Sequence, residues 1–209
     1  LYVGPDDERV RALIARFREQ TPRPLGPMAK AAVALGCAAA VPRQFRIVRR
    51  LAEYGFFRAG GVLIGTHAFV SLGNMLGIRF ADGAATLDVD FAHAGGNISV
   101  ALPANLKVDV HKAIDSLEMG FLPITELQGG EGGTYLNPAD PELRLDFVTP
   151  MTRASDKVVR IENLNIALQP LKFMEFALEN IDQAALLAEE GAVVVNVPAP
   201  ARFAVHKLI

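Results

Sequence analysis

Two aspartates, Asp88 and Asp90, lie two residues apart in the segment LDVDF at residues 87–91. The alternation predicts a strand with Leu87, Val89 and Phe91 on the core face and both carboxylates on the other, with roughly 7 Å between the carboxylate-bearing Cα atoms. Carboxylates placed in this way can converge on a hard cation. Paired divalent ions stabilise the attacking and leaving oxygens of phosphoryl transfer. Alternate aspartates are also common on the wet face of antiparallel sheets, so a structural role stays open.

A third aspartate, Asp146, repeats this pattern in the segment LRLDF at residues 143–147. It lies between Leu145 and Phe147, which we expect to face the core of a sheet. Asp146 is therefore the candidate that completes a three-carboxylate metal site. A simple ion pair with Arg144 is the structural alternative.

A turn that could bind phosphate precedes the aspartates, in GVLIGTHAF at residues 61–69. The pattern predicts a short buried strand that ends at Gly65 and a helix that follows it. A glycine lets backbone approach a phosphate closely, and the first turn of a helix offers free N–H groups. The Thr66 hydroxyl would add a donor, although threonine is also an ordinary helix-capping residue. His67 is expected to be a capping or core histidine, with ligand contact as the alternative.

The rest of the chain predicts an α/β (α+β) fold, in which helices flank a mixed β-sheet and a helical segment precedes it. We expect a helical N-terminal segment over residues 1–58 and a catalytic domain over residues 59–209. Helical periodicity or flanking signals predict helices in DDERVRALIARFREQ, MAKAAVALGCAAA, the segment opened by Pro42, NLKVDVHKAIDSLEMG, LQPLKFMEFALEN and RFAVHKLI. Alternation and turn residues predict two strands in TYLNPADPELRLDFVTP and one in AVVVNV.

Composition excludes several classes of protein. The formal net charge is −2 over 209 residues, so no global charge favours a nucleic acid or an anionic membrane. The single cysteine, Cys37, rules out a disulfide framework and favours a reducing, cytoplasmic compartment. No segment is long and apolar enough to span a bilayer, which predicts a soluble chain without a membrane partner. Four arginines are expected to form a solvated helix face, with nucleic-acid contact as the alternative: Arg43, Arg46, Arg49 and Arg50.

The two ends of the sequence indicate a longer polypeptide. The chain begins at Leu1 and stops at HKLI, where a new amphipathic element starts. We therefore expect the catalytic domain to be truncated at its C-terminal end.

The order of strand, Gly-Thr, helix, paired aspartates and later lone aspartate resembles the signature of the DNA polymerase β-like nucleotidyltransferase superfamily. Here the pattern reads LIGTHAF, LDVDFA and LRLDFVTP. The chain looks most like the bacterial nucleotidyltransferase-like proteins of unassigned substrate, whose features also include LYVGP, QPLKFMEF and VPAPARFAVHKLI. The resemblance covers nearly the whole chain, with Thr66 in place of the more usual serine.

The resemblance implies a role for each matching residue. Gly65 and Thr66 would hold the nucleotide phosphates, and Asp88 and Asp90 would bind Mg²⁺ (or Mn²⁺). Asp146 would help to hold the catalytic metal ion and to activate the acceptor. Lys207 matches a lysine near the start of a helix that contacts triphosphate in abortive-infection type toxins.

The expected activity is therefore a metal-dependent transfer of a nucleoside monophosphate from an NTP to an unidentified acceptor, with release of pyrophosphate. The acceptor could be RNA, protein or a small molecule. The alternative from another class is a non-catalytic nucleotide-binding or regulatory module on the same fold. A more distant alternative is a scaffold domain whose N-terminal helices bind a protein or nucleic acid.

Overall fold

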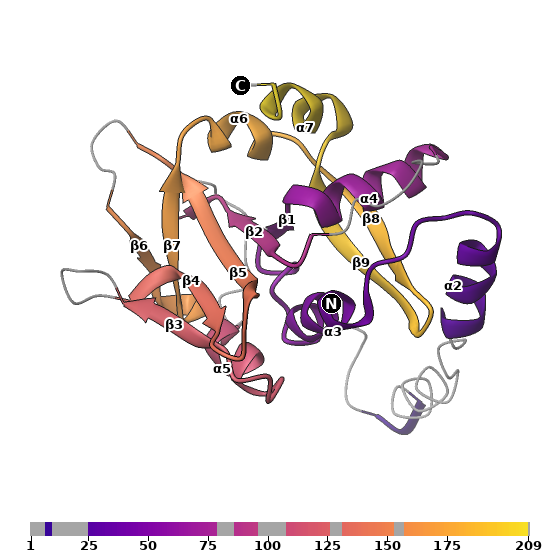
Figure 1. The fold of residues 1–209 in the computed structure, drawn as a ribbon, viewed down its shortest axis with the longest axis horizontal. Coiled ribbons are helices and arrows are strands. Elements are labelled where there is room, and N and C mark those ends of the chain that lie inside the picture. The colour runs from indigo at the N-terminus through magenta and orange to yellow at the C-terminus, as the bar shows by residue number, and fades with distance from the viewer. Residues whose placement is uncertain are drawn as a thin grey trace.

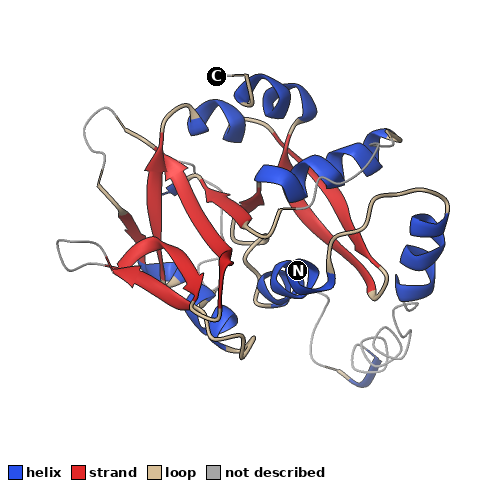
Figure 2. Ribbon diagram, viewed as in Figure 1, coloured by secondary structure: helices blue, strands red, loops and turns tan. Residues whose placement is uncertain are grey.

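The computed structural model describes residues 7–9, 25–78, 86–95, 108–125, 131–152 and 157–208. In these residues a mixed β-sheet, a separate β-hairpin and several helices pack together, as Figures 1 and 2 show. The predicted fold class, a mixed sheet flanked by helices, is confirmed. The predicted helix in DDERVRALIARFREQ lies almost wholly outside the described residues. Among the helices that are described, none combines the length and apolar character needed to cross a bilayer.

The main sheet brings together strands that are far apart in the sequence. Its central path runs in the order β1 (Gly61–Leu63), β2 (Val89–His93), β5 (Asp140–Pro150), β4 (Glu131–Asn137) and β3 (Leu122–Thr125). β2 and β5 are parallel, whereas the other neighbours on this path are antiparallel. β7 (Ile166–Leu171) pairs in parallel with the end of β5, and β6 (Val159–Ile161) pairs antiparallel with β7. The predicted β4–β5 hairpin is confirmed.

The second sheet is a hairpin of β8 (Ile181–Ala188) and β9 (Gly191–Pro198). The side-chain amide of Asn196 in β9 donates to the carbonyls of Phe57, at 2.7 Å, and Gly61, at 2.9 Å. Inward residues of the hairpin, such as Leu186 and Val197, join the same hydrophobic core as the main sheet. The hairpin is therefore attached to β1 by side chains.

The helices cover the two sheets (Figure 1). They are α2 (Leu25–Ala34), α3 (Pro42–Glu53), α4 (Gly65–Leu76), α5 (Val110–Asp115), α6 (Met174–Leu178) and α7 (Pro200–His206), with a 3-10 turn at Glu162–Leu164. α4 packs against β8 and β2, and α6 packs against α7. α3 begins at Pro42, which fixes a helical φ and needs no hydrogen-bond acceptor, and it buries Phe45, Ile47, Val48 and Leu51. The predicted boundary between residues 1–58 and 59–209 stays a prediction.

Aromatic rings fill the core on one face of β2 and β5. Phe91 and Phe147 stack with their centroids 5.0 Å apart, and Phe56 meets both rings edge-on. Phe91 follows Asp90 in β2, and Phe147 follows Asp146 in β5. Because successive side chains in a strand point to opposite faces, burial of the rings turns both aspartates away from this core.

Several helix predictions were wrong in extent. LQPLKFMEFALEN begins with the end of strand β7 and a turn, and its helix is only Met174–Leu178. Pairing of β7 with β5 and β6 holds the first residues extended, and Pro170 disfavours a helical residue before it. In NLKVDVHKAIDSLEMG the helix spans only Val110–Asp115, and in MAKAAVALGCAAA it ends at Ala34. Leu87 was predicted to face the core, but it precedes β2 and is 38% exposed, so this prediction was wrong.

Candidate functional site

The three predicted aspartates come together where β2 and β5 run side by side. Asp90 and Asp146 are paired positions in this parallel ladder. Neighbouring strands lie about 4.8 Å apart, so the two side chains are neighbours on one face. Asp88 lies two residues before Asp90, just ahead of β2. All three carboxylates are partly exposed on the face that α4 borders.

Gly65 opens α4 directly against Asp90. The strand before it is anchored by the Ile64 N–H, which donates to the Asp90 carbonyl at 3.0 Å. Gly65 itself has a φ of 63°, and a Cβ atom at this position would overlap Oδ2 of Asp90. The sequence predicted that this glycine allows a phosphate to approach the backbone closely. The geometry gives it a second role, since it makes room for the Asp90 carboxylate.

Arg144 links two of the aspartates. Its Nε lies 2.8 Å from Oδ2 of Asp146, and one terminal nitrogen lies 3.9 Å from Oδ2 of Asp88. The Thr134 hydroxyl on β4 donates to the other oxygen of Asp146, Oδ1, at 2.6 Å. Sequence reasoning considered Arg144 only as a structural partner of Asp146 and missed Thr134. Thr134 lies opposite Asp146 in the β4–β5 ladder, and no local sequence signal gives this register.

The carboxylates act on one another electrostatically. Burial, together with the negative charges of Asp88 and Asp146, raises the pKa of Asp90 to about 6, and the positive charges of Lys207 and Arg144 oppose this rise. An aspartate with this pKa lies in a site where excess negative charge is unfavourable. A bound cation would relieve that excess.

Lys207 lies near Asp90, although not in the position expected in its helix. It caps the C-terminal end of α7 instead of lying in a first turn, because the helix already starts at Pro200. Its ammonium lies 6.0 Å from the centroid of the Phe203 ring, and Phe203 stacks on Phe69 of α4 at 6.2 Å. This stacking sets α7 beside α4, so that the charge of Lys207 acts on Asp90.

Among the histidines, His67 is the one nearest the predicted phosphate turn. It is buried, and among the described residues its Nδ1 atom has no hydrogen-bond partner. Burial lowers its pKa, against a smaller opposing effect of Asp88. His93 has a structural role, since its ring nitrogens bond with the Ala59 carbonyl and the Gly95 N–H.

The donor set of the aspartates fits a hard divalent cation, because all of its ligating atoms are carboxylate oxygens. In the part of the chain that the structure describes, however, no three His, Cys, Asp or Glu side chains are arranged to surround a metal ion. The guanidinium of Arg144 lies between two of the carboxylates. A metal ion there would need Arg144 to withdraw.

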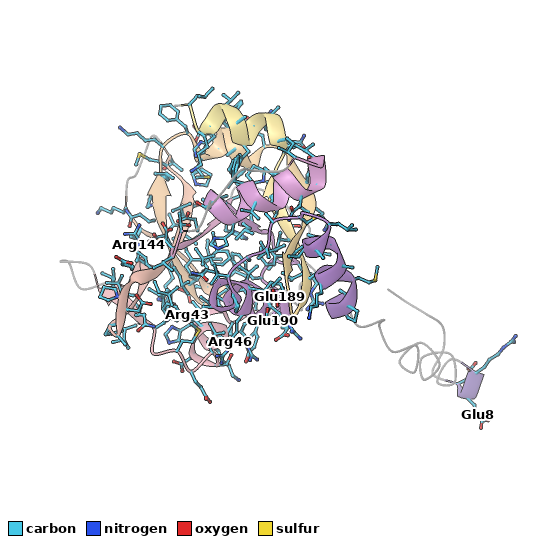
Figure 3. All side chains as sticks on the ribbon, turned by 45° about the vertical axis from the view of Figure 1, so that its right-hand side comes forward. Glu8, Arg43, Arg46, Arg144, Glu189 and Glu190 are labelled. Carbon is cyan, nitrogen blue, oxygen red and sulfur yellow. The ribbon has the colours of Figure 1, made fainter. Side chains whose placement is uncertain are left out.

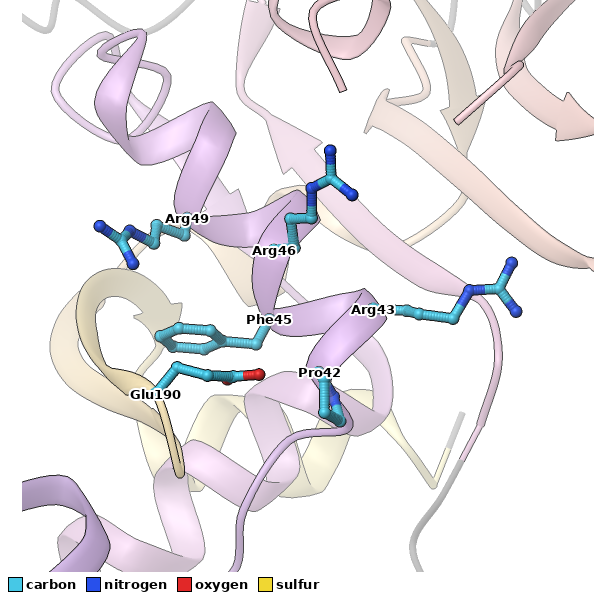
Figure 4. Close-up of a pocket in the computed structure, with 6 residues that line it drawn as sticks. All are labelled: Pro42, Arg43, Phe45, Arg46, Arg49 and Glu190. Atoms are coloured by element: carbon cyan, nitrogen blue, oxygen red, sulfur yellow. The ribbon is translucent and has the colours of Figure 1, made fainter. Parts of the chain in front are cut away.

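A pocket of about 390 Å³ lies at α3, apart from the aspartates, and is lined by Pro42, Arg43, Phe45, Arg46, Arg49 and Glu190. Figure 4 shows its three guanidinium groups pointing in different directions. Arg43 is paired with Asp140 at 2.7 Å, and Arg49 with Glu53 at 3.0 Å. Arg46 and Glu190 both line this pocket, and in Figure 3 Arg144 lies apart from them, on the side of the strands. This arrangement is the solvated helix face that the sequence favoured.

Comparison with known proteins gives one match. A family model described as nucleotidyltransferase matches residues 43–209, which include each of the six predicted site residues. No curated protein and no solved structure matches the chain. Membership in this family indicates a transferase and implies an NTP as substrate. With most of its length matched by the family model, the chain belongs to the nucleotidyltransferase family.

Proposed function

We propose that this chain transfers a nucleoside monophosphate from an NTP to an acceptor, with release of pyrophosphate, at the site of Asp88, Asp90 and Asp146. The observation that carries the proposal is the pairing of Asp90 with Asp146 in parallel strands, with the start of α4 packed against Asp90. Two carboxylates and a helix N-terminus thus border one site. That combination suits a metal–triphosphate complex.

Asp88, Asp90 and Asp146 would hold Mg²⁺ or Mn²⁺. The ion supplies charge neutralisation of the triphosphate and lowers the pKa of an acceptor hydroxyl. In the reaction, the acceptor oxygen attacks the α-phosphorus, the bond from that phosphorus to the β-phosphate oxygen breaks, and pyrophosphate leaves. Asp146, whose Oδ1 accepts from Thr134, would orient the acceptor.

The start of α4 and Lys207 would bind the phosphates. The first N–H groups of a helix have no partner within it, so Gly65 and Thr66 offer donors at the site, and the Thr66 hydroxyl adds another. Lys207 supplies a positive charge near Asp90, where it would face the β- and γ-phosphates. The Lys207 charge and the α4 donors approach Asp90 from two different helices.

The test is to combine nucleotide binding with a product assay. Each of the four NTPs is titrated by calorimetry with Mg²⁺ and with EDTA, and pyrophosphate release is measured with RNA, protein and small-molecule fractions as acceptors. We expect Mg²⁺-dependent binding that Asp88→Asn removes. Binding that is the same in EDTA, or that Asp88→Asn leaves intact, would reject this metal site.

A non-catalytic nucleotide-binding module on the same fold is the second candidate. The observation in its favour is that both oxygens of Asp146 are engaged, by Thr134 and Arg144. A module of this kind would bind Mg²⁺–NTP but release no pyrophosphate with any acceptor fraction. The same pair of assays therefore separates the two candidates.

A further inference from the structure

Both ion pairs of Arg144 are with aspartates of the proposed metal site. Its side chain is 48% exposed, and it reaches Asp146 at 2.8 Å and Asp88 at 3.9 Å. The guanidinium is therefore positioned between two carboxylates that would otherwise repel each other. Its positive charge neutralises part of the negative charge of Asp88 and Asp146, which a divalent cation would otherwise neutralise.

Each carboxylate oxygen of Asp146 has a side-chain partner. Oδ2 is ion-paired with Nε of Arg144, and Oδ1 accepts from the Thr134 hydroxyl. Each carboxylate oxygen keeps a further lone pair for a metal ion, but the positive guanidinium beside Oδ2 repels a cation, whereas the neutral Thr134 hydroxyl does not. Thr134 is a short side chain fixed in the middle strand of the β3–β4–β5 layer, whereas Arg144 is long and half-exposed. Arg144 is thus the partner that can leave at the smaller cost.

We propose that Arg144 is an internal counter-cation, which holds Asp146 and Asp88 in the metal-free protein and is displaced when a divalent ion binds. This inference rests on the proposed metal site. The proposal explains why three aspartates share one face although, among the described residues, their carboxylates are not arranged to surround a metal ion. Arg144 is a positioning residue in this account, and it sets the metal concentration at which the site fills.

A second ion pair in the same chain provides a matched control. Arg43 pairs with Asp140 at 2.7 Å, and the two arginines are almost equally exposed, at 49% for Arg43 and 48% for Arg144. Arg43 lies on α3, and its recorded ion pair is with an aspartate outside the site. Arg43→Gln therefore removes a similar arginine–aspartate pair without changing the charges at the proposed metal site.

The experiment measures Mn²⁺ binding without nucleotide, by electron paramagnetic resonance, for the parent chain, Arg144→Gln, Arg144→Lys and Arg43→Gln. We expect Arg144→Gln to bind Mn²⁺ about three- to tenfold more tightly than the parent, because removal of an exposed ion pair is a small effect. Arg144→Lys should remain close to the parent, and Arg43→Gln should match it.

A second measurement uses thermal unfolding, so that it also reports folding. Arg144→Gln should have a lower Tm than the parent in EDTA and should gain more from saturating Mg²⁺. Equal or weaker Mn²⁺ binding by a folded Arg144→Gln would overturn the proposal for Arg144 while leaving the nucleotidyltransferase site standing. If neither the parent nor Arg144→Gln binds Mn²⁺, both proposals are rejected, since Arg144 then has no ion with which to compete.

Discussion

Gly65 at the start of α4 is in contact with Asp90 on β2, and a Cβ atom at Gly65 would overlap the Asp90 carboxylate. Any side chain there must displace the Asp90 carboxylate from its place beside the start of α4. The glycine therefore couples the start of the helix to the position of the carboxylate. Substitution of Gly65 by valine cannot isolate phosphate binding, because it disturbs Asp90 as well.

Gly65→Ala should destabilise the protein through this overlap. Gly77, at the other end of α4, is the matched control, because its φ is also positive, at 69°, and no atom lies within 4 Å of a Cβ built there. Both substitutions incur the strain of a left-handed alanine, roughly 1–2 kcal/mol. Gly65→Ala should cost a further 1–3 kcal/mol or so in urea unfolding.

Removal of the carboxylate should rescue part of this loss. In an Asp90→Ala background, Gly65→Ala should cost nearly as little as Gly77→Ala, which a double-mutant cycle would measure. If Gly65→Ala and Gly77→Ala cost the same in the parent chain, the contact with Asp90 has no energetic weight.

The raised pKa of Asp90 predicts a dependence of stability on pH. Its pKa rises from 3.8 to about 6 on folding, so the folded protein binds this proton more tightly than the unfolded chain. The resulting stabilisation is present below about pH 3.8 and is lost as the pH rises through about 6. The loss in the free energy of unfolding is on the order of 1–3 kcal/mol.

Asp90→Asn should remove this dependence and stabilise the metal-free protein at pH 7. Urea unfolding from pH 4 to pH 8 gives the difference between mutant and parent, which should grow with pH. Glu142→Gln, at an exposed position of β5, is the control and should show little difference. A mutant that is no more stable than its parent at pH 7 would contradict the assignment of excess negative charge to this site.

Thr66 tests the phosphate turn without disturbing Asp90. Thr66→Ser keeps the hydroxyl, whereas Thr66→Val keeps the shape of the side chain and removes the hydroxyl. If the hydroxyl donates to a phosphate, Thr66→Val should weaken Mg²⁺–NTP binding about 3- to 10-fold, and Thr66→Ser should stay close to the parent. Equal affinities of the two variants in calorimetry would remove this hydroxyl from the site.

Lys207 should distinguish nucleotides by their phosphates. Lys207→Ala is expected to weaken NTP binding roughly 3- to 10-fold and to leave NMP binding nearly unchanged, because only the β- and γ-phosphates lose a partner. Lys172→Ala, an exposed lysine in the turn after β7, is the control for general loss of charge. Equal losses for NTP and NMP, or none for either, would place Lys207 outside the nucleotide site.

The sequence indicated the strands that carry the aspartates because their signal is local. Alternation with Val89, Leu145 and Phe147 was enough to place Asp90 and Asp146 opposite the core. The glycine turn was also evident from the change of period at Gly65.

The rest of the site depends on contacts between distant segments. The positions of Thr134 and Arg144 follow from the register of β4, β5 and β2, which no local pattern contains. β7 was mistaken for a helix for the same reason, since its partners β5 and β6 override the local preference. Leu87 was misplaced because the alternation begins two residues before the pairing with β5, which starts at Val89.

The attachment of β8 and β9 has a mechanical consequence. Among the described strands, this hairpin shares no backbone ladder with the main sheet, and the Asn196 amide bonds with two carbonyls at the edge of β1. Lys207 follows α7 at the end of this hairpin, whereas the aspartates belong to the main sheet. A ligand that touches both would hold the hairpin against the main sheet, so amide hydrogen exchange in β8 and β9 would slow when the nucleotide binds.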